Sequence, residues 1–250
     1  MDRADVAASL TAARYIEALK RHRSSAEAQR LARHLASGSK DAFLGVRMGR
    51  VFAISKEFKD LPPGEIAKLL KSRFHEVRAG GLKIMALQAA SRRTEEHRRK
   101  ELFELYLSRS DRIDNWDLVD VAAPAVIGRY LLDKPRTVLT KLARSPDPWE
   151  RRTAIVSTLF LIRRGEVEET FRIARILVRE GHELVQKATG GVLREAGKRD
   201  RPRLVEFLDR HASAMSRVAL RDATERLDQR QRSKFLGKAT PRARTGTRST

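Results

Sequence analysis

The segment from Asp114 to Asp120 carries the residue types in this chain that could do chemistry, because an aromatic ring stands among three carboxylates. In a helix, Trp116 and Asp120 are four positions apart and share a face, whereas Asp117 is turned away from Trp116 by about a quarter turn. Pro124 has no amide hydrogen for the carbonyl of Asp120, which predicts a kink or a helix start at this turn. We therefore expect Asp120 to be the chemical group and Trp116 its neighbour.

The charge of the chain indicates what such a group would act on. The sequence holds 53 Lys and Arg against 32 Asp and Glu, a formal net charge of +21. A basic excess of this size indicates a polyanionic partner, and nucleic acid is the one that we expect. The alternative is an anionic membrane surface. Because the longest apolar stretches, such as residues 153–162, are too short to span a bilayer, we expect no membrane partner.

An acid at position 120 is unusual on a surface that binds DNA, since it repels phosphate. Acids in such places are typical of sites where a positive centre must be stabilised. The alternative interpretation is a salt bridge from Asp120 to Arg151 or Arg152, which would make the carboxylate structural.

Metal-binding and secretory patterns are missing from the sequence. There is no cysteine, the six histidines are scattered, and His75-Glu76 lacks the second histidine four residues on that a zinc-binding helix needs. We therefore expect no metal and no cofactor. The first residues include Asp2 and Asp5 and no apolar core, so nothing resembles a secretory signal, and we expect a cytoplasmic location.

The spacing of apolar residues predicts a chain that is almost entirely helical. Apolar residues recur three and four positions apart, and the alternating runs typical of strands are missing. Breaks divide the chain into segments of about 12 to 20 residues, which predicts roughly a dozen helices arranged as hairpins. The main breaks are Ser37-Gly38, Pro62-Pro63, Pro135, Pro146, Pro148, Gly165, Gly181 and Pro202.

The second helices of several hairpins share an entry in which small and apolar residues surround a basic one. The basic positions are Arg78, Arg152, Lys187 and Arg217, in steps of 74, 35 and 30 residues, and half of 74 is 37. These steps match two-helix repeats, so the expected fold class is an all-α, HEAT-like or armadillo-type superhelical solenoid. The repeat between Arg78 and Arg152 falls at Asn115-Trp116, where the basic residue is replaced.

Stacked repeats bring equivalent positions to one surface. Arg78, Trp116, Arg152, Lys187 and Arg217 are therefore expected to line a concave basic groove that binds duplex DNA. A groove of this kind functions as a monomer. Arg78 and Arg217 have an alternative role, pairing within their own repeats, whereas for Arg152 the groove is the preferred interpretation.

The domain boundary is expected near residue 229. Residues 1–229 would form the repeat domain, and residues 230–250 carry seven Lys and Arg without an acid. This composition predicts a disordered basic tail. The tail would add salt-sensitive affinity for phosphate, or it would serve solubility alone.

Four stretches, in order, make the chain resemble a known family over residues 12 to 230. They are Phe43-Leu44-Gly45-Val46-Arg47, Asn115-Trp116-Asp117-Leu118-Val119-Asp120, Trp149-Glu150-Arg151-Arg152-Thr153-Ala154 and Gln186-Lys187-Ala188-Thr189-Gly190-Gly191-Val192-Leu193-Arg194-Glu195. With them the sequence resembles the AlkD-like DNA alkylation repair glycosylases, which are built from HEAT-like repeats. The resemblance implies that Trp116, Asp120 and Arg152 are catalytic site residues. One position departs from the family, because Gly191 stands where a Trp is usual, so one aromatic wall of the site is missing.

The resemblance also implies a reaction. The partner would be duplex DNA containing alkylated bases, and the enzyme would hydrolyse the N-glycosidic bond of purines alkylated at N3 or N7. Such a base is cationic and leaves without an enzyme acid, while Asp120 stabilises the oxocarbenium-like sugar and Trp116 flanks it. Arg152 would hold a phosphate, with weaker attraction from Lys187 and Arg78. At 6% aromatic residues we expect no base-flipping pocket.

Two other functions stay open on the sequence alone. A non-catalytic HEAT-like DNA-binding or scaffold protein needs only the groove, the charge and the tail, and Gly191 favours it. A solenoid that recognises an acidic protein would leave Trp116 and Asp120 as ordinary core and surface residues.

Overall fold

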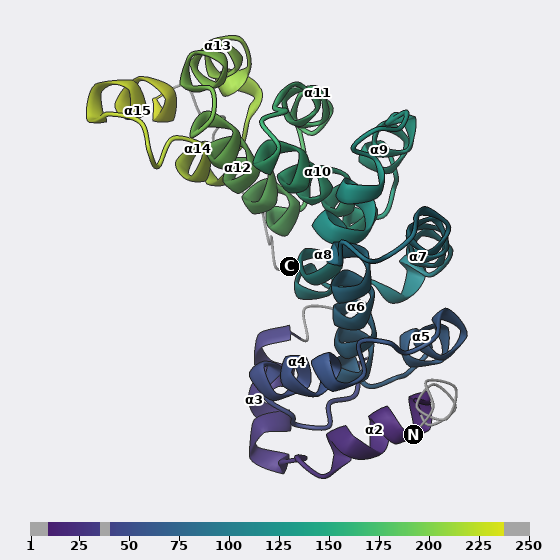
Figure 1. The fold of residues 1–250 in the computed structure, drawn as a ribbon. Coiled ribbons are helices and arrows are strands. Elements are labelled where there is room, and N and C mark those ends of the chain that lie inside the picture. The colour runs from purple at the N-terminus through teal and green to yellow at the C-terminus, as the bar shows by residue number, and fades with distance from the viewer. Residues whose placement is uncertain (1–9, 36–40, 238–250) are drawn as a thin grey trace. The chain divides into compact units, whose positions relative to one another are not determined.

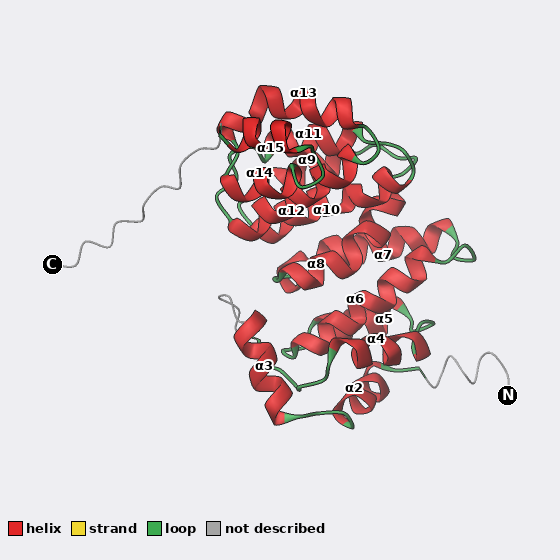
Figure 2. Ribbon diagram, turned by 90° about the vertical axis from the view of Figure 1, so that its left-hand side faces the viewer, coloured by secondary structure: helices red, strands yellow, loops and turns green. Residues whose placement is uncertain are grey.

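The chain is built from α-helices joined by short loops. The computed structural model describes residues 10–35 and 41–237, and within these ranges there are fourteen α-helices and no strand (Figure 2). The predicted all-α solenoid of helical hairpins is confirmed. None of the helices in these ranges combines the length and the apolar composition needed to cross a membrane. The concave groove stays a prediction.

The chain divides into two compact units, of which unit 1 is Met1–Pro135. Its helices are α2 (Ala12–Lys20), α3 (Ser25–Leu35), α4 (Met48–Glu57), α5 (Pro63–Leu70), α6 (His75–Ala90), α7 (Glu96–Ser108) and α8 (Trp116–Ala123). The central helix is α6, which packs against α4, α5 and α8 (Figure 1). Because α6 is buried on nearly every side, its polar side chains need partners inside the protein.

Unit 2, Arg136–Thr250, is a stack of hairpins. Its helices are α9 (Thr137–Ala143), α10 (Pro148–Arg163), α11 (Glu168–Ile176), α12 (Glu183–Gly197), α13 (Arg201–His211), α14 (Arg217–Ala223) and α15 (Gln229–Leu236). The first helices of the hairpins, α9, α11 and α13, form one row, and the second helices, α10, α12 and α14, form another (Figure 1). Gly190 lets α12 and α14 approach closely, since a Cβ there would lie 2.3 Å from the carbonyl oxygen of Ala219.

The second helices of three hairpins begin in the same way, which sets the register of the repeat. In each, the side chain at the fourth helical position donates a hydrogen bond to the backbone carbonyl six residues earlier. The pairs are Arg78 with Ser72 at 3.2 Å, Arg151 with Ser145 at 2.9 Å and Gln186 with Glu180 at 2.6 Å. Arg78 is therefore equivalent to Arg151, and the expected equivalence of Arg78 with Arg152 is one residue out of register.

The described helices extend beyond the boundary expected at residue 229. Helix α15 covers Gln229–Leu236, and Phe235 is completely buried. Lys234 pairs with Asp209 at 2.6 Å, which ties α15 to α13. Buried apolar surface and an ion pair hold this segment in place, so the first residues of the expected tail belong to unit 2. The rest of the expected tail, residues 238–250, lies outside the described residues.

Candidate catalytic and DNA-binding site

Helix α8 presents Trp116 and Asp120 on one side and its core residues on the other. Leu118 and Val119 are buried, whereas Asp120 is exposed and Trp116 is 39% exposed. Among the described residues, no other large hydrophobic side chain is classed as exposed. Trp116 and Asp120 are the first and fifth residues of the helix, so they lie one above the other on its accessible face.

The residues around Trp116 turn inward and anchor the start of α8. Asn115 donates from Nδ2 to the carbonyl of Leu35 at 2.9 Å, and its Oδ1 accepts from the amide of Trp116 at 2.8 Å. The Oδ1 of Asp114 accepts from Arg78 at 2.8 Å, and Asp117 turns to the interior as well. Side-chain oxygens at a helix start satisfy backbone amides that have no intrahelical partner. The first turn of α8 is therefore anchored through Asn115, Asp114 and Asp117, while the Trp116 side chain remains exposed.

His75, the first residue of α6, lies between two carboxylates. Its Nδ1 is 2.9 Å from Asp41 Oδ2, and its Nε2 is 2.7 Å from Asp117 Oδ2. The His75 side chain is completely buried. Burial alone would lower the pKa of His75, but the hydrogen bonds to Asp117 and Asp41 outweigh it and raise the pKa from 6.5 to about 9. His75 is therefore a buried cation at neutral pH.

Asp41 and Arg78 complete this cluster, which we call the His75 network: Asp41, His75, Arg78, Asp114 and Asp117. The Nη2 of Arg78 is 2.7 Å and 2.8 Å from the two carboxylate oxygens of Asp41. Burial alone would raise the pKa of Asp41, but the bonds from His75 and Arg78 lower it to about 2. The network holds two cations and three carboxylates, so most of its charge is compensated inside unit 1.

Arg78 is not available for the phosphate contact that we expected. Its guanidinium is completely buried and also donates to the carbonyls of Arg112 at 3.0 Å and Ser72 at 3.2 Å. The alternative role was pairing within its own repeat, but the ion pairs of Arg78 are with Asp41 and Asp114, 37 and 36 residues away, so it joins neighbouring repeats instead. An arginine that is enclosed by carboxylates and carbonyls contributes to the stability of the fold and cannot contact DNA.

The segment Phe43–Arg47 supports the network from the other side. The carboxylate of Glu76 accepts three successive backbone amides, from Leu44 at 3.0 Å, Gly45 at 2.7 Å and Val46 at 3.2 Å. Gly45 has a φ of +80°, and a Cβ there would lie 1.8 Å from the carbonyl oxygen of Ser24, so this position requires glycine. The loop thereby fixes Asp41, which precedes it, beside His75.

In unit 2 the same helix start carries a different pair. Arg151 binds Glu180 through Nε at 2.6 Å and Nη2 at 2.8 Å, a bidentate ion pair. Burial alone would raise the pKa of Glu180, but Arg151 lowers it. Arg151 is therefore held by Glu180 within unit 2.

The fifth position of the second helices carries the charged residues that we expected at the site. Asp120 occupies it in α8, Arg152 in α10 and Lys187 in α12. Arg152 is only 7% exposed and donates to the carbonyl of Leu184, whereas the Lys187 side chain is 44% exposed and pairs with Glu183 at 2.9 Å. In α14 the fifth residue is Arg221, and Arg217 is the first, so the counterpart of Lys187 in α14 is Arg221 rather than Arg217.

Similarity to known proteins now bears on this geometry. Residues 15–227 match the model of a family described as DNA alkylation repair enzyme. The chain belongs to the DNA alkylation repair enzyme family. A solved structure described as "Predicted DNA alkylation repair enzyme from Enterococcus faecalis" has a similar fold, with a TM-score of 0.66 and 15% sequence identity over 83% of this chain and 98% of that one. No curated protein matches the chain.

Gly191 is the position at which the resemblance to this family implies a Trp. This residue is the ninth of α12, one turn after Lys187, and a Cβ built on it would have no atom within 4 Å. Gly190 beside it is enclosed by α14, as described above. Close packing against α14 therefore explains the glycine at position 190, whereas packing would allow a larger residue at position 191.

The backbone after α8 departs from a regular helix, as Pro124 predicts. Residues Pro124–Gly128 form a π helix, in which the amide of Arg129 reaches the carbonyl of Pro124. Single turns of π helix arise where an ordinary helical hydrogen bond cannot form, and they are frequent at functional sites. This turn begins four residues after Asp120.

Asp41 and His75 were not predicted as parts of this site, and neither was the pairing of Asp114 with Arg78. Their contacts join residues 34 to 42 positions apart, and no local spacing indicates such pairs. Arg221 could have been found by counting from the start of each second helix. In the part of the chain that the structure describes, no three His, Asp or Glu side chains are arranged to hold a metal ion, and both nitrogens of His75 face carboxylates.

Proposed function

We propose that this member of the DNA alkylation repair family is a DNA glycosylase that removes purines alkylated at N3 or N7 from duplex DNA. The observation that carries the proposal is the exposed pair Trp116 and Asp120 on one face of a helix whose start is otherwise anchored. An aromatic ring and a carboxylate together on an accessible, anchored turn are the groups that the proposed reaction needs.

Asp120 would act on the charge that develops during bond cleavage. An alkylated purine is cationic and leaves as a neutral base, so no enzyme acid is needed. The sugar becomes oxocarbenium-like, and a carboxylate beside it stabilises this charge more than it stabilises the ground state. Trp116, one turn before Asp120, would lie against the deoxyribose and exclude water from that side.

The second helices of unit 2 would hold the phosphates. Lys187 and Arg221 have exposed side chains, at 44% and 59%, and each can move from a neighbouring carboxylate to a phosphate at small cost. Arg152 would contribute less, because only 7% of the residue is exposed. Arg78 is left out of the proposal because it is enclosed.

The lesion would be recognised without base flipping. Trp116 stands on an open helix face rather than inside a ring of aromatic side chains, and such a ring is what reads an extruded base. We infer that the enzyme engages the deoxyribose while the base stays stacked. It would act on DNA in the cytoplasm as a monomer and without a cofactor.

A second candidate is a DNA-binding member of the family without activity. Gly191 favours it, because the space beside α12 is empty where the resemblance implies a Trp. Aromatic contact with a nucleotide is worth on the order of 1 to 3 kcal/mol, so its loss would weaken catalysis without abolishing binding.

Single-turnover release of methylated purine from methylated duplex DNA separates these candidates. For a glycosylase, Asp120→Asn should lower the release rate about 100-fold, while affinity for the duplex holds or rises because a repulsive charge is gone. The matched control is Asp60→Asn, which removes an exposed carboxylate elsewhere in unit 1 and should change neither quantity. No release by the intact protein, despite tight and salt-sensitive binding, would establish the second candidate.

A further inference from the structure

We propose that His75 is a positioning residue for the site on α8: by bridging Asp41 and Asp117 it fixes the first helical turn and the directions of Trp116 and Asp120. The proposal rests on the function proposed above for those two residues. His75 itself is enclosed, so it reaches neither substrate nor solvent.

The geometry requires the doubly protonated form of the ring. Each ring nitrogen lies within hydrogen-bond distance of a carboxylate oxygen, 2.9 Å to Asp41 and 2.7 Å to Asp117. Neutral imidazole carries one N–H, so it can donate to one carboxylate, and its other nitrogen would present a lone pair to the second. Both bonds therefore exist together only while His75 is protonated.

Asp117 transmits this requirement to the catalytic face. It is the second residue of α8, between Trp116 and Leu118, and its other carboxylate oxygen accepts the amide of Leu118 at 2.9 Å. The carboxylate thus joins the helix start to His75. Losing the bond to His75 would leave Asp117 partly buried beside a neutral ring, and the turn that carries Trp116 would lose one of its anchors.

The surrounding charges keep the ring protonated over most of the pH range. The charged groups around it are Asp41 from the loop, Asp114 and Asp117 from the start of α8, Arg78 and Glu76 from α6, and Arg112 from the turn after α7. Arg78 pairs with Asp41 and Asp114, whereas Asp117 pairs with His75, so Asp117 is the main counter-charge of His75. The raised pKa of about 9 agrees with this balance.

Trp116 gives a direct optical reading of the arrangement without any activity. The chain has two tryptophans, so the Trp149→Phe variant leaves Trp116 as the single emitter. We expect its emission to change with a midpoint near pH 9, to show no such transition after His75→Gln, and to shift its midpoint to lower pH after Asp117→Asn, which removes one counter-charge. An emission that is constant from pH 7 to pH 10, or a transition that survives His75→Gln, would overturn the proposal.

The rate of base release then tests whether the positioning of the α8 turn by His75 contributes to catalysis. Relative to the intact protein at the same pH, Asp117→Asn should release base a few-fold more slowly at pH 6, where His75 stays protonated and can still donate to the Asn oxygen, and roughly tenfold more slowly again at pH 8.5. Duplex affinity should stay within about twofold at both values. A purely structural role would lower the rate by the same factor at both pH values, and that result would overturn the proposal.

The failures of the two proposals can be told apart. If release by the intact protein does not depend on Asp120, the glycosylase proposal fails, while the Trp116 emission still decides whether His75 fixes the turn. If release depends on Asp120 but the Asp117→Asn ratio is independent of pH, the positioning proposal fails alone. Asp60→Asn, the exposed acid used above, should keep a ratio near one at both pH values.

Discussion

The starts of α8 and α12 show two uses of one helical position. In α8 the fifth residue is the acid Asp120, and the helix start is held by the buried His75 network. In α12 the fifth residue is Lys187, which is exposed and pairs with Glu183 on its own helix. The fifth helical position thus carries an acid on an anchored helix start in unit 1 and an exposed base in unit 2. This difference fits the proposed roles, since a catalytic group must be held in position, whereas a side chain that binds phosphate can move.

The largest expected effect comes from breaking the network that supports α8. Arg78→Met leaves Asp41 and Asp114 without their cation, so we expect the free energy of unfolding to fall by about 3 to 5 kcal/mol, measured by urea denaturation. The salt dependence of duplex binding should stay unchanged in the folded fraction. Normal stability with weakened DNA binding would show instead that Arg78 contacts DNA.

The pH dependence of the free energy of unfolding should also distinguish the His75 network in unit 1 from the Arg151–Glu180 pair in unit 2. His75 has a raised pKa in the folded state, so its contribution is fully present below 6.5 and is lost as pH rises through about 9. Asp41 has a lowered pKa, so its contribution is present above 3.8 and is lost as pH falls through about 2. His75→Gln should remove the alkaline loss measured by urea denaturation between pH 7 and pH 10.

The matched variant in unit 2 is Glu180→Gln, which breaks the pair with Arg151. It should lower stability without removing the alkaline loss, since the pair contains no group that titrates there. An alkaline loss that persists in His75→Gln would assign it to another part of the protein.

Substituting alanine for either of two neighbouring glycines in α12 should change the stability of unit 2 by a smaller amount, and in opposite directions. Gly190→Ala places a Cβ against the carbonyl of Ala219 and should destabilise unit 2 by about 1 to 3 kcal/mol. Gly191→Ala meets open space and should be neutral or stabilising by up to about 1 kcal/mol, because alanine favours the helix. Thermal unfolding of the two variants measures both effects, and equal destabilisation would contradict the difference in packing.

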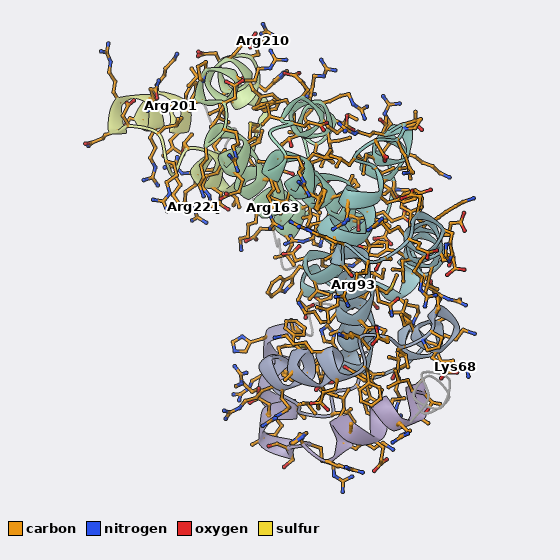
Figure 3. All side chains as sticks on the ribbon, viewed as in Figure 1. Lys68, Arg93, Arg163, Arg201, Arg210 and Arg221 are labelled. Atoms are coloured by element: carbon orange, nitrogen blue, oxygen red, sulfur yellow. The ribbon has the colours of Figure 1, made fainter. Side chains whose placement is uncertain are left out.

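The smallest expected effects concern single bases in unit 2. Lys187→Gln and Arg221→Gln should each reduce the slope of log affinity against log salt by about 0.9, the value for one phosphate. Arg210→Gln is the control, because Arg210 lies on the α13 side of unit 2 whereas Arg221 lies on the α14 side (Figure 3). A similar loss for all three variants would mean that DNA is attracted by net charge rather than by the second helices.

The fold could be predicted from the sequence because it rests on local spacing. Apolar periodicity, together with Pro and Gly breaks, gave the helical hairpins, and Pro124 indicated the irregular turn after Asp120. The positions of Trp116 and Asp120 on one face also follow from helical geometry alone. What failed was register: Arg78 is the fourth residue of its helix and Arg152 is the fifth, and both are buried rather than exposed on a groove.

The support of the site could not be predicted from the sequence. His75 meets Asp117 across 42 residues, and six scattered histidines offer no reason to choose this one. Phe235 looked like part of a basic tail because its neighbours are polar, yet it packs into unit 2. These features depend on contacts between distant segments, which determine burial and therefore charge state.

The most direct test of the account compares Asp120→Asn with Lys187→Gln in one assay of methylated duplex DNA, with release rate at saturating protein and affinity measured separately. We predict that Asp120→Asn loses release and keeps affinity, whereas Lys187→Gln loses affinity and keeps release. Equal losses of both quantities in both variants, or normal release by Asp120→Asn, would contradict the division between a fixed acid for chemistry and adjustable bases for binding.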